Sequence, residues 1–243
     1  NIKFCKQDIA QYKPDVLVLI DYPGFNMRIA KWAKQQGLKV VYYISPQIWA
    51  WKQNRVHALR RDVDRMLCIL PFEVSFYKKF GWDVDFVGHP LLDAVAQRKP
   101  KVLLPELPKD KPIVALLPGS RTQEIKTMLP VMLQVAENFP EYTFVIAGAP
   151  SRKAAFYDAF KRGKNVFLVL DETYNLLQQA HAALVTSGTA TLETALFNVP
   201  EVVCYKGSTL SYHIAKRLVK VAYISLVNLV MDTMLVKELI QHD

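Results

Sequence analysis

Short apolar runs alternate with segments of helical spacing along most of the chain. Runs rich in Val, Ile and Leu that are bounded by turn residues have the pattern of buried strands. Gly37 and Gly81 follow two of the helical segments and are expected to end them. Strands that alternate with helices predict a parallel sheet covered on both faces. In this part of the chain the strands are predicted at 16–20, 40–44, 65–70 and 84–87, and the helices at 26–36, 55–61 and 73–80.

The alternation lapses between residues 98 and 112, where proline and charged residues dominate, as in an interdomain linker. The tail from 210 to 241 is predicted to be mostly helical around an irregular stretch at 225–228. The chain is therefore predicted to be an α/β protein with two Rossmann-like domains, 1–97 and 113–243, whose parallel sheets face each other across a ligand-binding cleft. The second domain is predicted to hold strands at 113–117, 143–147, 166–169, 183–186 and 201–205, and helices at 123–138, 151–161, 173–180 and 190–197.

Composition narrows the possible partners. Hydrophobic residues make up 51% of the 243 residues, and the formal net charge is +9. A positive charge suits phosphorylated ligands, an anionic membrane surface or nucleic acid. Nucleic acid is not expected, because the sequence has no aromatic-glycine RNA motif, zinc finger or dense basic tail. No apolar run reaches the roughly 18 to 20 residues that cross a bilayer, the opening residues are unlike a signal peptide, and three distant cysteines favour a reducing cytoplasm.

Two short segments indicate a phosphate site. Free N–H groups at a helix N-terminus bind phosphate, and a guanidinium can bind a diphosphate with two hydrogen bonds. Glu193 lies one turn into the helix that follows Ser187-Gly188-Thr189, where it can accept both hydroxyls of a ribose or act as a first-turn carboxylate favoured by the helix dipole. Ser187-Gly188-Thr189 can also simply cap that helix. Each segment stands between an apolar strand and a helix: Gly119, Ser120 and Arg121 in the first, and Ser187, Gly188 and Thr189 in the second.

Asp21 follows the strand at 16–20 and precedes a Pro-Gly turn. It is either a turn former or helix N-cap, or a general base that removes a proton from an acceptor hydroxyl. Two Asp-Val-Asp triplets, at 62–64 and 83–85, mimic a metal motif, but we interpret them as a helix end and a strand and expect no metal. His89 has no nearby set of metal-binding residues, so it is interpreted as structural or cleft-lining, with a substrate contact left open.

An aromatic segment passes into a basic one between residues 49 and 61, and it includes Trp49, Trp51 and Arg55. One interpretation is a packed loop followed by a solvated helix. The other is a surface that meets anionic lipid headgroups and guides acyl chains, as Trp, Lys and Arg do at membrane interfaces.

The motifs resemble those of one family, the lipid-A-disaccharide synthases, which are inverting GT-B glycosyltransferases of outer-membrane lipid A assembly. The resemblance spans almost the whole chain, and the Ser-Pro-Gln-x-Trp-Ala-Trp segment is its most specific part. Five segments carry it in order: Leu19-Ile20-Asp21-Tyr22-Pro23-Gly24-Phe25-Asn26, Tyr43-Ile44-Ser45-Pro46-Gln47-Ile48-Trp49-Ala50-Trp51, Phe86-Val87-Gly88-His89-Pro90-Leu91, Leu117-Pro118-Gly119-Ser120-Arg121 and Ser187-Gly188-Thr189-Ala190-Thr191-Leu192-Glu193.

The resemblance implies a reaction and its partners. UDP-2,3-diacylglucosamine would donate its sugar to 2,3-diacylglucosamine 1-phosphate, giving the β-1,6-linked disaccharide 1-phosphate and UDP. It implies no metal or other cofactor, a cytoplasmic location at the inner membrane of a Gram-negative bacterium, and peripheral contact with anionic lipid; a homodimer is left open. Asp21 would be the base, the two phosphate segments with Glu193 and Asn228 would bind UDP, and the acceptor or membrane side would hold Asn26, Gln47, Trp49, Trp51, Arg55 and His89.

Three departures from the family are expected to matter. The family's N-terminal Gly-rich loop is absent, and the C-terminal segment that crosses back to the first domain is also absent, so we expect the natural protein to extend at both ends. Thr233 stands near the place where family members usually carry Arg.

Other functions remain open alongside this one. A UDP-sugar epimerase and the transferase that builds the peptidoglycan lipid intermediate share the fold type, but the segment at 45–51 argues against both. A non-catalytic nucleotide-sugar-binding protein would need no base. A dehydrogenase is not expected, because no Gly-x-Gly-x-x-Gly follows a predicted strand.

Overall fold

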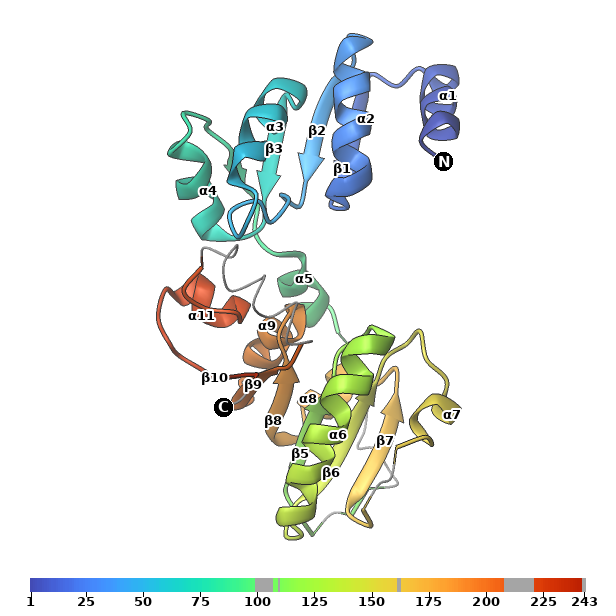
Figure 1. Cartoon of the computed structure of the whole chain (residues 1–243), viewed down its shortest axis with the longest axis vertical. Coiled ribbons are helices and arrows are strands. Elements are labelled where there is room, and N and C mark those ends of the chain that lie inside the picture. Colours follow the sequence, from blue (N-terminus) through green and yellow to red (C-terminus); the bar gives the residue numbers. More distant parts are fainter. Residues whose placement is uncertain (99–106, 109, 161–162, 208–220, 242–243) are drawn as a thin grey trace. The chain divides into compact units, whose positions relative to one another are not determined.

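A computed structural model describes residues 1–98, 107–108, 110–160, 163–207 and 221–241 (Figure 1). Its contacts divide the chain into two compact units, one of residues 1–90 and one of the described residues from Leu91 onward. This division lies seven residues before the end of the predicted first domain, whose boundary at 97 stays a prediction. Most of the predicted linker lies outside the described residues, but Leu107 within it is buried in the core of the second unit.

The first unit is a four-stranded parallel sheet in the order β1-β2-β3-β4. Helix α2 packs on β1 and β2, α3 contacts α2, and α4 contacts β3 and β4 (Figure 1). β1 lies at the edge, and its Val16, Val18 and Ile20 are exposed. The elements are α1 Ile2–Tyr12, β1 Val16–Ile20, α2 Pro23–Gln35, β2 Lys39–Tyr43, the 3₁₀ turn η1 Gln53–Arg55, α3 Val56–Asp62, β3 Arg65–Cys68, α4 Pro71–Lys78 and β4 Asp85–Phe86.

The second unit is a six-stranded parallel sheet in the order β10-β9-β8-β5-β6-β7. Its elements are α5 Pro90–Ala96, β5 Ile113–Leu117, α6 Thr122–Asn138, β6 Thr143–Gly148, α7 Ala154–Tyr157, β7 Val166–Leu170, α8 Thr173–Leu177, β8 Ala180–Thr186, α9 Thr189–Leu196, β9 Glu201–Tyr205, α11 Leu226–Met231 and β10 Lys237–Ile240.

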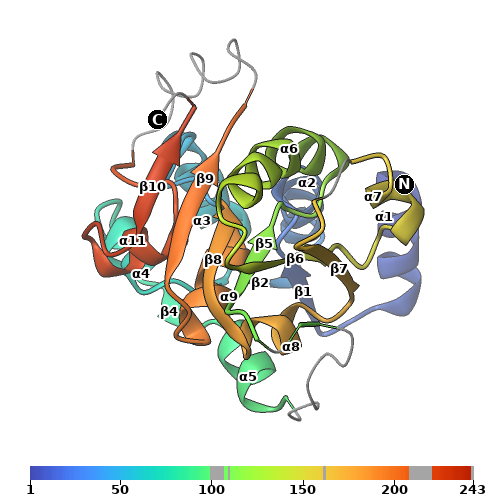
Figure 2. The same ribbon diagram turned by 90° about the horizontal axis from the view of Figure 1, so that it is seen from below.

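Strand β5 shows why helices cover both faces of this sheet. Its residues alternate in direction, so Val114 and Leu116 join the core cluster that contains Ile125 and Leu129 of α6. Ala115 and Leu117 join the opposite cluster, which contains residues of α8. Figure 2 shows α6 on one face and α8 and α9 on the other. A strand buried on both faces needs the continuous apolar run that the sequence has here.

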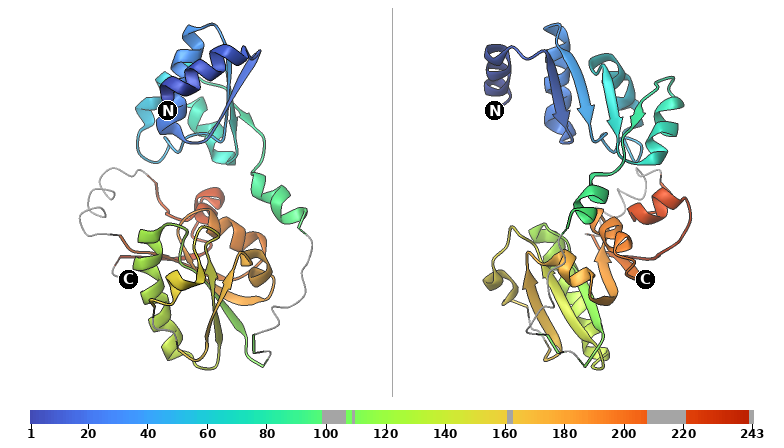
Figure 3. Two further views of the ribbon diagram at one scale, coloured as in Figure 1. Left: turned by 90° about the vertical axis from the view of Figure 1, so that its right-hand side faces the viewer. Right: turned by 180° about the vertical axis from the view of Figure 1, so that it is seen from behind.

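The structure differs from the sequence-based prediction at the two ends. Residues Ile2–Tyr12 form α1, which was not predicted, and the helix buries none of its residues. The tail was predicted to be mostly helical, which is wrong for Lys237–Ile240, because these residues form β10 and pair in parallel with β9. Lys237–Ile240 is a short segment, and its strand structure depends on this pairing with β9, which lies far away in the sequence. Figure 3 shows α11 beside α9, with which it is in contact.

Candidate functional site

The loop between β5 and α6 contains the first predicted phosphate segment. Gly119 has φ +100°, which L residues rarely adopt, and a Cβ there would lie 2.8 Å from Oε2 of Glu124. The position therefore requires glycine, both for its backbone angle and for the close approach of this carboxylate.

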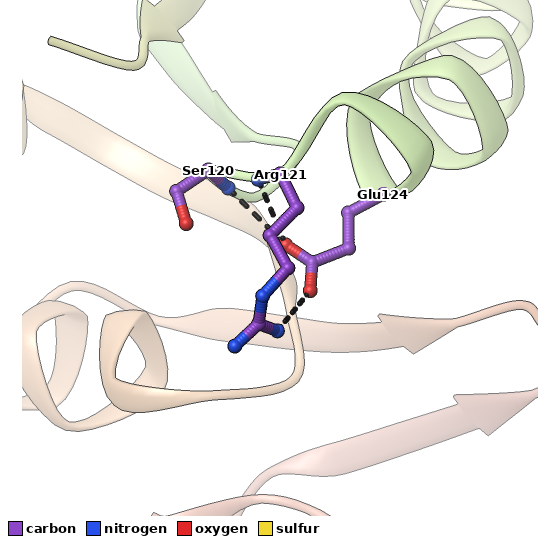
Figure 4. Close-up of polar contacts among 3 residues, drawn as sticks. All are labelled: Ser120, Arg121 and Glu124. Carbon is purple, nitrogen blue, oxygen red and sulfur yellow. Dashed lines mark hydrogen bonds and ion pairs between the residues drawn. The ribbon is translucent and has the colours of Figure 1, made fainter. Parts of the chain in front are cut away.

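Glu124 occupies the N-terminus of α6. The backbone N–H groups of Ser120 and Arg121 donate to its Oε2 at 3.3 and 3.2 Å, and Nη1 of Arg121 donates to its Oε1 at 2.6 Å (Figure 4). These are the amides and the guanidinium that the sequence predicts for phosphate. Sequence reasoning missed Glu124, although a Glu three residues after the N-cap is the capping-box signal.

The loop between β8 and α9 contains the second predicted phosphate segment. The Ser187 hydroxyl donates to the carbonyl of Ile224 at 2.7 Å, which ties this loop to the segment before α11. Gly188 is the N-cap of α9, and among the described residues no side chain caps this helix. Gly188 and Thr189 are exposed. Amides at an uncapped helix N-terminus are able to accept an anion, and the predicted phosphate contact of this loop stays a prediction.

The two loops lie at the same edge of one sheet. β5 and β8 are adjacent parallel strands, with Leu116 opposite Leu184 and Leu117 opposite Val185. Both strands therefore end side by side, and both helices begin from that edge. The structure thus brings together the two segments that the sequence places 68 residues apart (Gly119 to Ser187).

Glu193 is partly buried on α9. Its Oε1 accepts a hydrogen bond from the Tyr174 hydroxyl at 2.9 Å, and burial raises the pKa of the Glu193 carboxyl. Burial and the nearby Glu193 raise the pKa of Tyr174 to about 12. The Arg98 guanidinium lies 5.6 Å from the Tyr174 ring centre. Tyr174 and Arg98 were not singled out in the sequence, because their contacts join positions far apart in the chain.

Asn228 lies in α11, and the prediction of an irregular stretch here is wrong. Its side chain is fully buried. Nδ2 donates to the carbonyl of Val236 at 2.9 Å and to Oε1 of Glu238 at 2.8 Å. Oδ1 accepts from the N–H groups of Leu235 and Val236 at 2.8 and 2.9 Å. An amide side chain has no further hydrogen-bonding capacity, so this residue connects α11 to β10, and its predicted contact with a nucleotide would require breaking these bonds.

Asp21 follows β1 in the first unit, with an exposed side chain. Asp21 and Tyr22 both have left-handed backbones, with φ of 45° and 44°. The Asp21 carbonyl accepts hydrogen bonds from Nδ2 of Asn26 at 2.7 Å and from the Tyr42 hydroxyl at 2.6 Å. No described residue donates a hydrogen bond to its carboxylate, so the backbone is fixed while the carboxylate faces solvent. Asn26, predicted to be on the acceptor side, is instead buried and holds this turn.

The segment from Ser45 to Trp51 has a buried half and an exposed half. Trp49 is buried, donates from Nε1 to Oε1 of Glu73 at 3.2 Å, and packs edge-on against Phe72. The packed-loop interpretation therefore holds for Trp49, and its predicted place on an acceptor or membrane surface is wrong. Glu73 is also buried, which raises its pKa, and its Oε2 accepts the N–H groups of Ile69 and Leu70.

The exposed half of this segment carries the remaining predicted residues. Gln47 is exposed, and Trp51 is 47% exposed. Nζ of Lys52 lies 4.3 Å from the Trp51 ring centre, and the Arg55 guanidinium carbon lies 5.7 Å from it. Such cation–π contacts group one aromatic ring with two positive charges. His89 is partly buried, and burial lowers its pKa, which favours the neutral imidazole.

The acidic triplets form ion pairs. Asp62 pairs with Arg61, Asp64 with Lys34, and Asp85 with Arg65. Within the described ranges, His, Cys, Asp and Glu side chains form no group of three or more that could hold a metal ion. In the same ranges no helix combines the length and apolar character that a membrane span requires.

Solved structures of similar architecture define the fold class. A putative UDP-N-acetylglucosamine 2-epimerase from Listeria monocytogenes matches with a TM-score of 0.62 and 13% identity over 95% of this chain and 67% of that one. A calicheamicin glycosyltransferase matches with a TM-score of 0.57 and 18% identity over 98% of this chain and 66% of that one. These likenesses show the fold, a GT-B-type α/β fold with two sets of parallel strands.

Sequence comparison then gives the family. The family model described as lipid-A-disaccharide synthetase matches residues 2–243, so the chain belongs to this family. It is 41% identical to lipid-A-disaccharide synthase 1 of Legionella pneumophila (strain Paris), over 98% of this chain and 65% of the relative. The chain thus spans just under two thirds of the length of this relative.

Proposed function

We propose that this chain belongs to a glycosyltransferase that moves 2,3-diacylglucosamine from UDP to the 6-hydroxyl of 2,3-diacylglucosamine 1-phosphate, with β-1,6 linkage and release of UDP. The observation that carries the proposal is the pair of glycine-containing strand–loop–helix turns on adjacent strands β5 and β8. Membership of this family and the free amides of such turns support the binding of a nucleotide diphosphate.

The second unit is proposed to stabilise the leaving group. As the bond to the sugar breaks, negative charge grows on the UDP oxygens. Helix N–H groups around Ser120 and Thr189, together with the Arg121 guanidinium, would stabilise that charge without a metal. Glu193 would accept the ribose hydroxyls, and the Tyr174 hydroxyl bond supports this role because it fixes the position of the carboxylate.

The first unit is proposed to supply the base. The Asp21 carboxylate would take the proton of the acceptor hydroxyl as that oxygen attacks the anomeric carbon, and inversion needs only this one base. Its exposed side chain and fixed backbone support the role.

The finer proposals concern location and assembly. We propose that the protein acts at the cytoplasmic face of the inner membrane, where Trp51, Lys52 and Arg55 meet anionic lipid. Gln47 and His89 are proposed to contact the acceptor, and a homodimer of the full-length protein is a further proposal.

The test uses Asp21→Asn in the full-length protein, with Asp15→Asn as the control because Asp15 is also an exposed carboxylate beside β1. Turnover of both lipid substrates is followed by mass spectrometry, and UDP affinity by calorimetry. We expect Asp21→Asn to lower kcat about 10²- to 10⁴-fold with UDP affinity unchanged. Full turnover in this variant contradicts the role of the base. A wild-type protein that binds UDP without forming the disaccharide is a binding protein, and one that alters the UDP-sugar without an acceptor is an epimerase.

A further inference from the structure

A carboxylate of the protein lies where the proposed function needs a diphosphate. We propose that Glu124 is a resident competitor for the anion site at the start of α6, so that UDP binds by displacing this side chain. The inference rests on the proposed function, because it assigns the same loop to the nucleotide. It adds a residue that sets nucleotide affinity and specificity.

The geometry makes the two occupants exclusive. Oε2 of Glu124 accepts both the Ser120 and the Arg121 N–H groups. Each N–H group carries one hydrogen and the two share a single acceptor atom, so a phosphate oxygen can take them only after that atom leaves. The absence of a side chain at Gly119 lets the loop backbone lie close to Glu124, because a Cβ on residue 119 would lie only 3.0 Å from the Glu124 Cβ. Both amides are therefore already occupied by Glu124.

The contacts that hold Glu124 are of a kind that exchanges readily. The Arg121 side chain is 81% exposed and that of Glu124 31% exposed, so water screens their ion pair. α6 has 17 residues, and its N-terminal N–H groups attract whichever anion is present. A diphosphate carries more negative charge and more acceptor oxygens than one carboxylate, and it can bind Arg121 with two hydrogen bonds. We therefore expect a diphosphate to displace the Glu124 carboxylate from these amides, and uncharged ligands to leave it in place.

Removing the charge of Glu124 should then tighten UDP binding. Glu124→Gln keeps the size of the side chain and an oxygen that can accept the same N–H groups. Its amide does not repel phosphate and leaves Arg121 unpaired. Glu137→Gln is the matched control, because it removes one negative charge from the exposed far end of the same helix. Arg121→Ala tests the proposed function itself.

Calorimetric titrations of UDP and of uridine into all four proteins separate the outcomes. We expect Glu124→Gln to bind UDP about three- to tenfold more tightly than wild type, in line with the strength of a single helix cap. We also expect unchanged uridine affinity and no effect of Glu137→Gln. Equal or weaker UDP binding by Glu124→Gln overturns the inference, as does an equal gain for uridine. If wild type does not bind UDP, or Arg121→Ala binds it as well as wild type, the proposed function fails instead.

Discussion

Glu201 begins β9 and is buried, with 8% of its surface exposed. Neither carboxylate oxygen has a hydrogen-bond partner in the part of the chain that the structure describes. Burial therefore raises its pKa from 4.5 to about 8. Between pH 4.5 and about pH 8, Glu201 keeps its proton in the folded chain but releases it in the unfolded chain. The free energy of unfolding of the second unit therefore falls as pH rises through this range. Above pH 8 the carboxylate is charged in both states, and the penalty stays constant.

We expect Glu201→Gln to remove this penalty, because the amide has nearly the shape of the protonated carboxyl and never ionises. One pKa unit corresponds to about 1.4 kcal/mol, so the full penalty is on the order of 5 kcal/mol at high pH. Water that enters beside the charged carboxylate reduces this penalty. The variant should therefore match wild type near pH 4.5 and exceed it by about 2 to 5 kcal/mol at pH 9.

Urea unfolding at several pH values, followed by far-UV circular dichroism, measures this difference. All four tryptophans lie in the first unit, so tryptophan fluorescence follows that unit separately and should not change. Glu141→Gln, which neutralises an exposed carboxylate, is the control for net charge. A difference between Glu201→Gln and wild type that is the same at pH 5 and pH 9 would refute the reasoning.

Two further predictions concern other parts of the chain. Asn228→Ala should destabilise the second unit by about 3 kcal/mol, because it removes the four hydrogen bonds of a fully buried amide. Asn138→Ala, which removes one exposed bond, should change the free energy of unfolding by under about 0.5 kcal/mol in the same urea experiment. Arg55→Glu should weaken co-sedimentation with anionic vesicles several-fold, since each basic residue near such a surface contributes about 1 kcal/mol. Arg28→Glu, at an exposed position of α2, is its control, and equal binding by Arg55→Glu and wild type contradicts the membrane contact at Trp51.

Strands could be predicted where a continuous apolar run bounded by turn residues marks them in the sequence. β1, β5 and β9 have the predicted bounds, and β5 is the one of these three that is buried on both faces. β10 and α11 could not be predicted in the same way. Their structure depends on the Glu238 carboxylate, which accepts from the N–H groups of Ile224 and Ser225 and from the Asn228 side chain. These contacts link residues 10 to 14 positions apart, and no periodic pattern records them.

The candidate site shows the same limit at the level of side chains. Each predicted phosphate loop does lie between a strand and a helix, and the pairing of β5 with β8 places the two loops at one sheet edge, while their binding of phosphate stays a prediction. The sequence did not show that Glu124 fills the first loop, since the motif was interpreted for its ligand and not for its own capping residue. Trp49 and Asn26 were assigned by motif alone, and their burial depends on Glu73 and on the backbone of Asp21. The motifs therefore identified which segments to examine, but they did not show which side chains of a segment are buried and which are exposed.

The two left-handed residues after β1 have a consequence for protein engineering. A left-handed backbone costs on the order of 1 kcal/mol in residues other than glycine, and Asp21 and Tyr22 adopt it in succession. Selection for heat resistance alone would therefore favour glycine at position 21 and discard the proposed base. A screen for heat-resistant variants therefore has to measure turnover as well, because the turn whose backbone lowers stability also holds the proposed base.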